Sequence, residues 1–191
     1  MKKVIGTTIV DVWINAVKAI INEGKNIIHE GKNTREISNL ILNIESPLDL
    51  GEPSEEDADF LFSYLINPLP ADTWFSEYSR IFDYYGMNQM ELIIEKLKNK
   101  PDSRSATISL IEPKIDLANH FTCLSLINYK TEKNRLNATC IYRSHDYGGK
   151  AYSNLAFQGK LMRCLCEELK IKPGTLTCHS ISAHIYLPQL K

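Results

Sequence analysis

The sequence lacks a long apolar run and lacks an excess of charge of either sign. Its 191 residues carry 22 basic and 23 acidic side chains, so nothing global favours nucleic acid or an anionic membrane as a partner. No segment approaches the roughly 18 consecutive apolar residues of a membrane span. Residues 1–22 superficially resemble a signal peptide, but Asp11 and Asn15 interrupt the apolar stretch, and we predict a helix there instead. We therefore expect a cytoplasmic protein without a membrane or nucleic-acid partner.

Metal-binding patterns are also missing. The five cysteines are an odd number without a secretory signal, which favours reduced, intracellular thiols. No Cys-x-x-Cys or His-x-x-x-His pair occurs; Cys164 and Cys166 diverge on a helix, and Cys178 and His179 point opposite ways on a strand. A glycine-rich phosphate loop is absent as well. We expect no metal centre.

What the sequence does contain is hydrophobic periodicity of both kinds. Thr8 and Asp11 resemble a capping box, and Gly24 is placed to end the helix that follows. Further helices are predicted over 87–98 and 154–169, while 46–58 is either a loop or the first turn of a helix over 54–66. Strands are predicted over 37–44, 106–111, 122–129, 136–142 and 175–186, with a loop at 143–153. The class is α/β or α+β, one domain over residues 1–191 around a single mixed sheet flanked by helices.

The densest polar cluster is Arg143-Ser-His-Asp-Tyr-Gly-Gly149. An Arg beside a Ser can grip a phosphate, and the glycines let backbone approach a ligand, although an exposed polar loop is the plainer reading. Asn154 is either a helix N-cap or an amide that reads uracil. His184 and Tyr186 share one face of a strand and could bind sugar hydroxyls, or one could satisfy a buried carbonyl.

Cys123 lies in an apolar strand, where a free cysteine is usually a small buried hydrophobe. A neighbouring cation would favour its thiolate and make it a nucleophile, and Arg143 across the predicted hairpin is the candidate. The enzymatic interpretation therefore requires the Cys123 sulfur and the Arg143 guanidinium on the same side of the sheet, with the thiol accessible.

The joint spacing of these residues resembles that of thymidylate synthases. In that family a catalytic Cys precedes an Arg by twenty positions on the same hairpin, as Cys123 precedes Arg143. The family Asn follows its Asp by eight, as Asn154 follows Asp146, and the Ala-His-x-Tyr run ending at Tyr186 also fits. The resemblance is strong over about 101–186. It is weak over 1–100, whose texture is closer to short archaeal thymidylate-synthase-like proteins and to nucleotide hydroxymethylases.

The resemblance implies a role for each residue of the cluster. Cys123 attacks C6 of the pyrimidine, and C5 becomes the carbon nucleophile. Arg143 and Ser144 bind the phosphate, and Asp146 orients base and folate. Asn154 reads the uracil base, and cytosine-specific relatives typically carry Asp at this position. His184 and Tyr186 contact the sugar 3′-hydroxyl.

Three residues outside the cluster also match the family. Arg104 resembles an Arg pair that reaches the phosphate of the partner subunit, which implies a homodimer. Tyr78 matches a Tyr that helps to remove the C5 proton, and Arg35 is a further phosphate contact. Glu55, Glu56 and Trp74 are loose matches to the side chains that activate folate.

The activity implied is methylation of dUMP to dTMP with methylenetetrahydrofolate. Departures from the family keep two alternatives open: Leu124 stands where the family has His, Ser105 replaces the second Arg, and Tyr142 replaces a Gln. The printed chain ends at Lys191, where full-length synthases continue and close over folate. Without such a lid, water could add to the one-carbon unit and give a hydroxymethyl product. The third possibility is a nucleotide-binding protein that has lost turnover.

Overall fold

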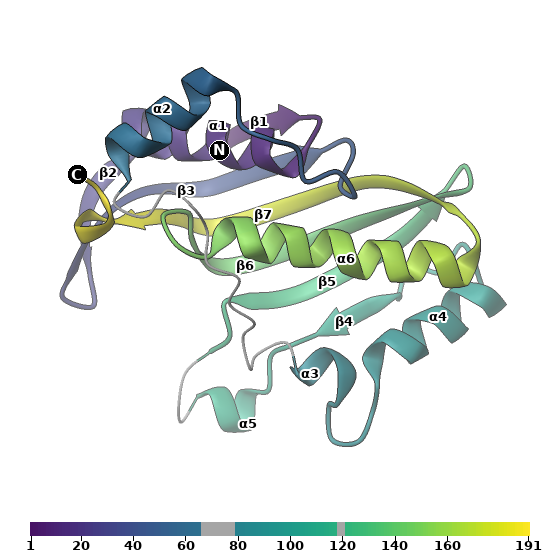
Figure 1. The fold of residues 1–191 in the computed structure, drawn as a ribbon. Helices are drawn as coiled ribbons and strands as arrows, with labels where there is room; N and C mark the ends of the chain where they lie inside the picture. The colour runs from purple at the N-terminus through teal and green to yellow at the C-terminus, as the bar shows by residue number, and fades with distance from the viewer. Residues whose placement is uncertain (66–78, 118–120) are drawn as a thin grey trace.

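The computed structural model describes residues 1–65, 79–117 and 121–191 (Figure 1). Within these residues seven strands form one mixed sheet in the order β1-β3-β7-β6-β5-β4, with β2 paired to β3. The strands are β1 (Lys2–Gly6), β2 (Lys25–His29), β3 (Lys32–Ile44), β4 (Thr107–Ser109), β5 (Leu124–Glu132), β6 (Arg135–Asp146) and β7 (Lys172–Tyr186). The β1–β3 and β6–β7 pairs are parallel and the others antiparallel. The predicted mixed sheet is confirmed.

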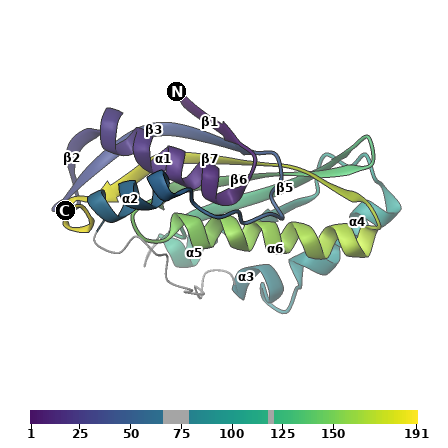
Figure 2. The same ribbon diagram turned by 45° about the horizontal axis from the view of Figure 1, so that its top comes forward.

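Helices cover one face of this sheet. They are α1 (Ile9–Glu23), α2 (Glu55–Tyr64), α3 (Ser79–Phe82), α4 (Gln89–Asn99), α5 (Pro113–Asp116) and α6 (Ala151–Leu169), with a 3-10 turn, η2 (Leu187–Gln189), after the last strand. The long helix α6 connects the parallel strands β6 and β7 and packs between α1 and α4, and Figure 2 shows α1 and α6 on the same side of the sheet. None of the described helices combines the length and apolar character needed to cross a membrane.

The N-terminal segment differs in part from its prediction. The capping box is present: the Thr8 N–H donates to Asp11 Oδ2 at 3.1 Å, and the Asp11 N–H donates to Thr8 Oγ1 at 3.2 Å. The helix begins at Ile9 and its C-cap is Gly24, as the capping box and the glycine predicted, so only the helical interpretation of the residues before Thr8 is wrong. Residues 2–6 form β1 instead, because they pair in parallel with Leu40–Ile44 far along the chain.

Other boundaries moved as well. Of the two alternatives for residues 54–66, the structure has the helix, α2. Strand β2 and the first residues of β3 were not predicted. The predicted loop over 143–153 is wrong for its first four residues, because β6 continues to Asp146. Helix α6 begins at Ala151 with Lys150 as its cap, so Asn154 is not the N-cap.

A row of irregularities crosses four strands at one level. In β3, Asn39 has a φ of +58° and falls between the pairs Ser38–Ser182 and Leu40–Ser180 of β3 and β7. On the other side of β7, Arg143 of β6 falls between the pairs Tyr142–Ser180 and Ser144–Ser182. In β5 the pairing slips between Leu124 and Leu126, leaving one extra residue, which is a β-bulge.

This row reverses which side chains face the helices. Along β6, Cys140 and Tyr142 are buried before the row, but His145 and Tyr147 are buried after it; along β7 the buried set changes from Cys178 and Ser180 to Ala183 and Ile185. Because neighbouring side chains on a strand point to opposite faces, the residues between these are turned away from the helices. The residues concerned are Ser144, Asp146, Ser182 and His184.

Candidate active site

Cys123 and Arg143 lie opposite each other at one end of the β5–β6 hairpin. The Arg143 N–H donates to the Cys123 carbonyl at 2.9 Å, and the next pair is Leu124 with Tyr142. Directly opposed residues of an antiparallel pair project to the same face, so sulfur and guanidinium start from the same side of the sheet. Cys123 is half-buried and takes part in no disulfide. This pairing is the arrangement that the enzymatic interpretation requires, and the roles of Cys123 and Arg143 stay predictions.

The Arg143 side chain turns back over the segment that precedes the cysteine. Its Nε donates to the carbonyl of Thr122 at 3.0 Å and of Phe121 at 3.2 Å, and a terminal nitrogen also donates to Phe121. Backbone and side chain of Arg143 therefore both hold residues 121–123. A cation beside a thiol favours the thiolate form.

The polar side chains of β6 and β7 gather just beyond Arg143. Asp146 lies beside His184 and Ser144 beside Ser182 in the parallel pair. The rings of His184 and Tyr186 meet edge to face, with centroids 4.9 Å apart. Ser182 donates to Glu36 Oε2 at 2.5 Å and has its Oγ 3.4 Å from His184 Nδ1.

Electrostatics connect these groups to Cys123. Burial raises the pKa of Tyr186, and negative charge on Asp146 and on Cys123 raises it further, while Arg143 opposes the rise. Burial lowers the pKa of His184 below its usual value, against the opposing influence of Asp146. Both rings are therefore neutral at pH 7, the form in which they exchange hydrogen bonds with uncharged hydroxyl groups.

Asn154 lies one turn into α6, with only 5% of its surface exposed, and its N–H donates to Lys150. The turn before it is tied to α1 because Trp13 Nε1 donates to the Tyr147 carbonyl at 3.1 Å. The amide of Asn154 is thus held on a rigid helix start that directly follows the site strand.

The two glycines of the polar cluster leave room for the side chains of Asp146 and Gln189. A Cβ on Gly149 would lie 2.7 Å from Asp146 Oδ2, and one on Gly148 would lie 2.6 Å from Gln189 Oε1. Sequence reasoning missed Gln189, since an isolated Gln after the last strand carries no pattern. Its contact with Asp146 could be found only from coordinates.

Two predicted site residues in the described part of the chain are not brought to this cluster. Arg35 donates from Nε to the Ile20 carbonyl and from a terminal nitrogen to Asn26, each at 3.1 Å, so its charge lies at the C-terminal end of α1. Arg104 is exposed beyond β4, near the opposite end of β5 from Cys123. The nine residues of β5 separate those ends by roughly 27 Å. Tyr78 lies outside the described residues, as does Trp74.

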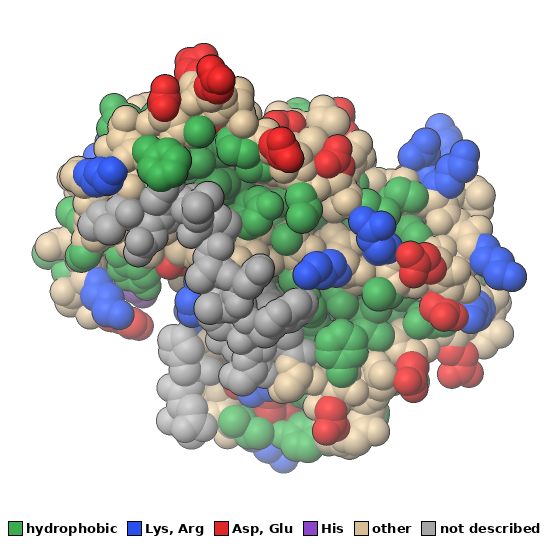
Figure 3. Space-filling view, in the orientation of Figure 1, with side chains coloured by type: hydrophobic (Ala, Val, Ile, Leu, Met, Phe, Trp, Pro, Cys, Tyr) green, Lys and Arg blue, Asp and Glu red, His purple; other side chains and the backbone are tan. Residues whose placement is uncertain are grey.

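Glu55 and Glu56 are exposed in the first turn of α2, where acidic side chains favour a helix N-terminus. Figure 3 shows the acidic side chains gathered over that helix. In the described part of the chain, no three His, Cys, Asp or Glu side chains come close enough to hold a metal ion.

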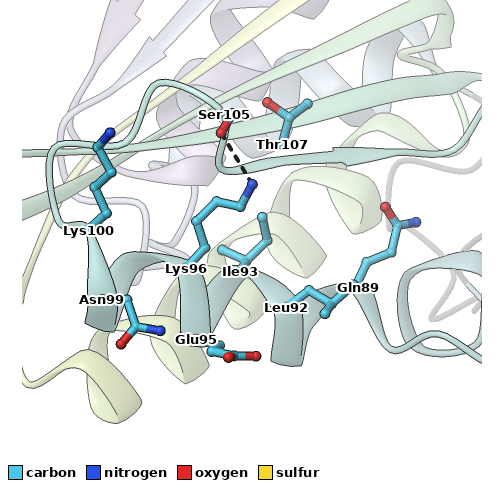
Figure 4. A pocket seen from close by; sticks show the side chains of 9 residues that line it. All are labelled: Gln89, Leu92, Ile93, Glu95, Lys96, Asn99, Lys100, Ser105 and Thr107. Atoms are coloured by element: carbon cyan, nitrogen blue, oxygen red, sulfur yellow. Dashed lines mark hydrogen bonds between the residues drawn. The ribbon is translucent and has the colours of Figure 1, made fainter.

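Two cavities open at opposite parts of the sheet. One, of about 550 Å³, is lined by Tyr186, η2 and the β2–β3 turn, and Lys32 Nζ lies 5.4 Å from the Tyr186 ring centre. The other, of about 460 Å³, lies between α4 and β4 (Figure 4). There Lys96 donates to Ser105 at 3.2 Å, so this cavity adjoins the loop of Arg104 and not Cys123.

Known proteins are similar to this chain in sequence and in fold. The sequence model of the thymidylate synthase family matches residues 13–191. Archaeal relatives provisionally named thymidylate synthases include those of Methanosarcina barkeri, 33% identical over 80% of this chain and 74% of its own, and Methanosarcina mazei, 39% identical over 52% and 46%. The chain thus spans about half the length of the M. mazei protein. The solved thymidylate synthase from T4 phage has the same fold, with a TM-score of 0.69, 16% identity, and coverage of 92% of this chain and 76% of its own.

The chain belongs to the thymidylate synthase family.

Proposed function

We propose that the protein transfers a one-carbon unit to C5 of dUMP, with Cys123 as the nucleophile and dTMP as the product. The observation that carries the proposal is the opposition of Cys123 and Arg143 across the hairpin, with Asp146, His184 and Tyr186 at the same end of the sheet.

The first step is addition of the thiolate to the ring. A lone pair of Cys123 Sγ forms the bond to C6, and the C5–C6 double-bond electrons move toward C5 and the O4 carbonyl. Arg143 stabilises the thiolate before attack. C5 would then form a bond to the methylene carbon of bound methylenetetrahydrofolate. Loss of the C5 proton would accompany cleavage of the bond between that carbon and the folate nitrogen, which leaves an exocyclic methylene on the ring. For dTMP, a hydride from the folate would add to this methylene as the C5–C6 double bond re-forms and the Cys123 thiolate leaves. Tyr78, in the family role of assisting that proton loss, stays a prediction.

The nucleotide is held by groups on three elements. Arg143 and Ser144 bind the phosphate, and the Asn154 amide can accept from N3–H and donate to O4 of uracil. The neutral rings of His184 and Tyr186 contact the sugar hydroxyl. Arg35 remains a predicted phosphate contact that would require its side chain to leave Ile20 and Asn26.

In this proposal Asp146 is the residue that binds the folate. Its half-buried carboxylate already accepts from the Gly148 N–H and from Gln189, one bond on each oxygen, and each oxygen can accept another. It can therefore bind N–H groups of a pterin or of the base. When bound, methylenetetrahydrofolate supplies the one-carbon unit, and for a methyl product also the hydride.

A second copy of the chain completes the site. Arg104 is too far from Cys123 within one chain, while the face of the sheet opposite the helices exposes apolar side chains, including Ile5 at 53% and Ile181 at 45%. Packing two such faces in a two-fold dimer buries these side chains and lets Arg104 reach the partner's phosphate site.

The test is incubation with dUMP, dCMP, UMP or CMP plus methylenetetrahydrofolate, followed by mass spectrometry. A methyl on dUMP supports the proposal. A product heavier by one oxygen identifies a hydroxymethylase. Binding of dUMP without any product, together with no release of C5 tritium, would reduce the protein to a nucleotide binder.

A further inference from the structure

Gln189 connects the two strands that carry the proposed site. The turn η2 brings it back over the end of β6, where its Nε2 donates to Asp146 Oδ2 at 3.1 Å. The Oε1 atom of the same amide accepts from the Tyr186 N–H at 2.9 Å. One side chain thereby holds a carboxylate on β6 and the backbone of a site residue on β7.

The space for this contact is made by two glycines. A Cβ on Gly149 would approach Asp146 Oδ2 to 2.7 Å and Gln189 Nε2 to 3.1 Å, and a Cβ on Gly148 would approach Gln189 Oε1 to 2.6 Å. Neither glycine has the positive φ that side chains avoid. Glycine is needed here for room and not for backbone conformation, so the pair and Gln189 form one arrangement.

Asp146 is fixed in its plane by this arrangement. Oδ1 accepts from the Gly148 N–H at 3.1 Å and Oδ2 accepts from Gln189, so each oxygen is held by its own donor. A carboxylate held at only one oxygen can rotate about its terminal bond. The second contact removes that freedom while leaving acceptor positions for a ligand.

We infer that Gln189 is a positioning residue for the one-carbon transfer, acting by orienting the Asp146 carboxylate and the Tyr186 backbone. The inference rests on the proposed function. A merely structural role, in which Gln189 only fastens the last turn, would affect the amount of folded protein but not the rate of each folded molecule.

The decisive variant is Gln189→Glu, which keeps the size of the side chain but replaces the donating nitrogen by an oxygen facing Asp146. Release of tritium from C5 of labelled dUMP is measured without folate, and dTMP formation is measured with it. We expect the rate at saturating dUMP to fall roughly tenfold to a hundredfold, the range for losing a hydrogen bond to a charged group. The KM for dUMP should change less than the rate. Gly149→Ala should produce the same pattern.

The matched control is Gln89→Ala. Gln89 also holds its amide on fixed partners, the Arg80 carbonyl and both backbone groups of Ser109, but it joins α4 to β4, which β5 separates from the two strands that Gln189 connects. Its loss should lower the melting temperature without changing the rate per folded molecule. A parental rate in Gln189→Glu, or a fall that follows only the folded fraction, overturns the inference alone. A folded parent protein that neither binds dUMP nor releases tritium defeats the proposed function, and the inference with it.

Discussion

The N–H of Arg143 donates to the carbonyl of Cys123 at 2.9 Å, and the Arg143 guanidinium holds the two carbonyls before it. The backbone and the side chain of one residue therefore both hold the segment that carries the Cys123 thiol. In the proposed mechanism the same residue is also the cation that favours the thiolate.

Replacement of Cys123 by Ser should abolish turnover and C5 tritium release, because a hydroxyl is a far weaker nucleophile at neutral pH than a thiolate. The side chain is half-buried and nearly isosteric with Ser, so the melting temperature should stay within a few degrees of the parent. The control is Cys164→Ser on the exposed face of α6, which should retain full activity. Measurable release by Cys123→Ser would show that another group performs the addition.

Replacement of Asn154 by Asp should move base preference from uracil toward cytosine. The site is 95% covered, so burial favours the protonated carboxyl, which can donate and accept in the swapped sense. The measurement is the ratio of C5 tritium release from dUMP and dCMP. Asn137→Asp at the far end of β6, where Oδ1 accepts from the Thr175 N–H at 2.9 Å, is the control. An unchanged ratio in Asn154→Asp would contradict a base-reading role.

The parts of the fold that the sequence predicted are those with local causes. The β5–β6 hairpin was predictable because its two alternating runs are separated by a short charged turn, and the capping box at Thr8 lies within four residues. The residues 2–6 were misread because their strand forms only by pairing with Leu40–Ile44, and no local pattern reports that partner. Residues 143–146 look like a loop because the reversal at the row of irregularities places polar side chains where a strand pattern expects apolar ones.

The candidate site likewise has a part that could be predicted from the sequence and a part that could not. Cys123 and Arg143 could be paired from the sequence because both lie on one hairpin, and the family spacing extended this to Asp146, Asn154, His184 and Tyr186. The contact of Gln189 with Asp146 joins positions 43 apart through a turn, and nothing in the local sequence indicates it. The separation of Arg104 from Cys123 likewise required the register of β4 and β5.

Mixing two inactive variants tests whether Arg104 acts on a partner. Cys123→Ser and Arg104→Ala should each be inactive or weak alone. After subunit exchange, half the dimers are mixed, and each mixed dimer contains one site with an intact Cys123 and a partner's intact Arg104. Activity should therefore recover to roughly a quarter of the parental value.

The control for that experiment is a mixture of Cys123→Ser with His184→Ala. Both residues are placed by the same chain at the same end of the sheet, so no exchanged dimer can contain a complete site. Recovery in this second mixture, or its absence in the first, would contradict the assignment of Arg104 to the neighbouring subunit.

The ion pair of Arg80 and Asp116 should make stability depend on pH. Its nitrogen and oxygen atoms are 2.7 and 3.0 Å apart, and only 1% of the Asp116 side chain is exposed. Hydrogen bonding to Arg80 holds the pKa of Asp116 below its usual value despite burial. The native state therefore binds fewer protons than the unfolded state near that value. The stabilisation is complete above the unfolded pKa of about 3.9 and is lost as pH falls through the lower native value.

Asp116→Asn keeps the shape of the side chain and its acceptor for the Glu112 N–H but leaves Arg80 without a charged partner. It should reduce the free energy of unfolding by about 3 kcal/mol at pH 7, and the difference from the parent should shrink as pH falls below about 4. Urea unfolding at several pH values measures both quantities. Glu168→Gln, which removes the exposed partner of Lys98, should change neither. A difference between Asp116→Asn and the parent that is constant down to acid pH would mean that the contact acts through shape and not through charge.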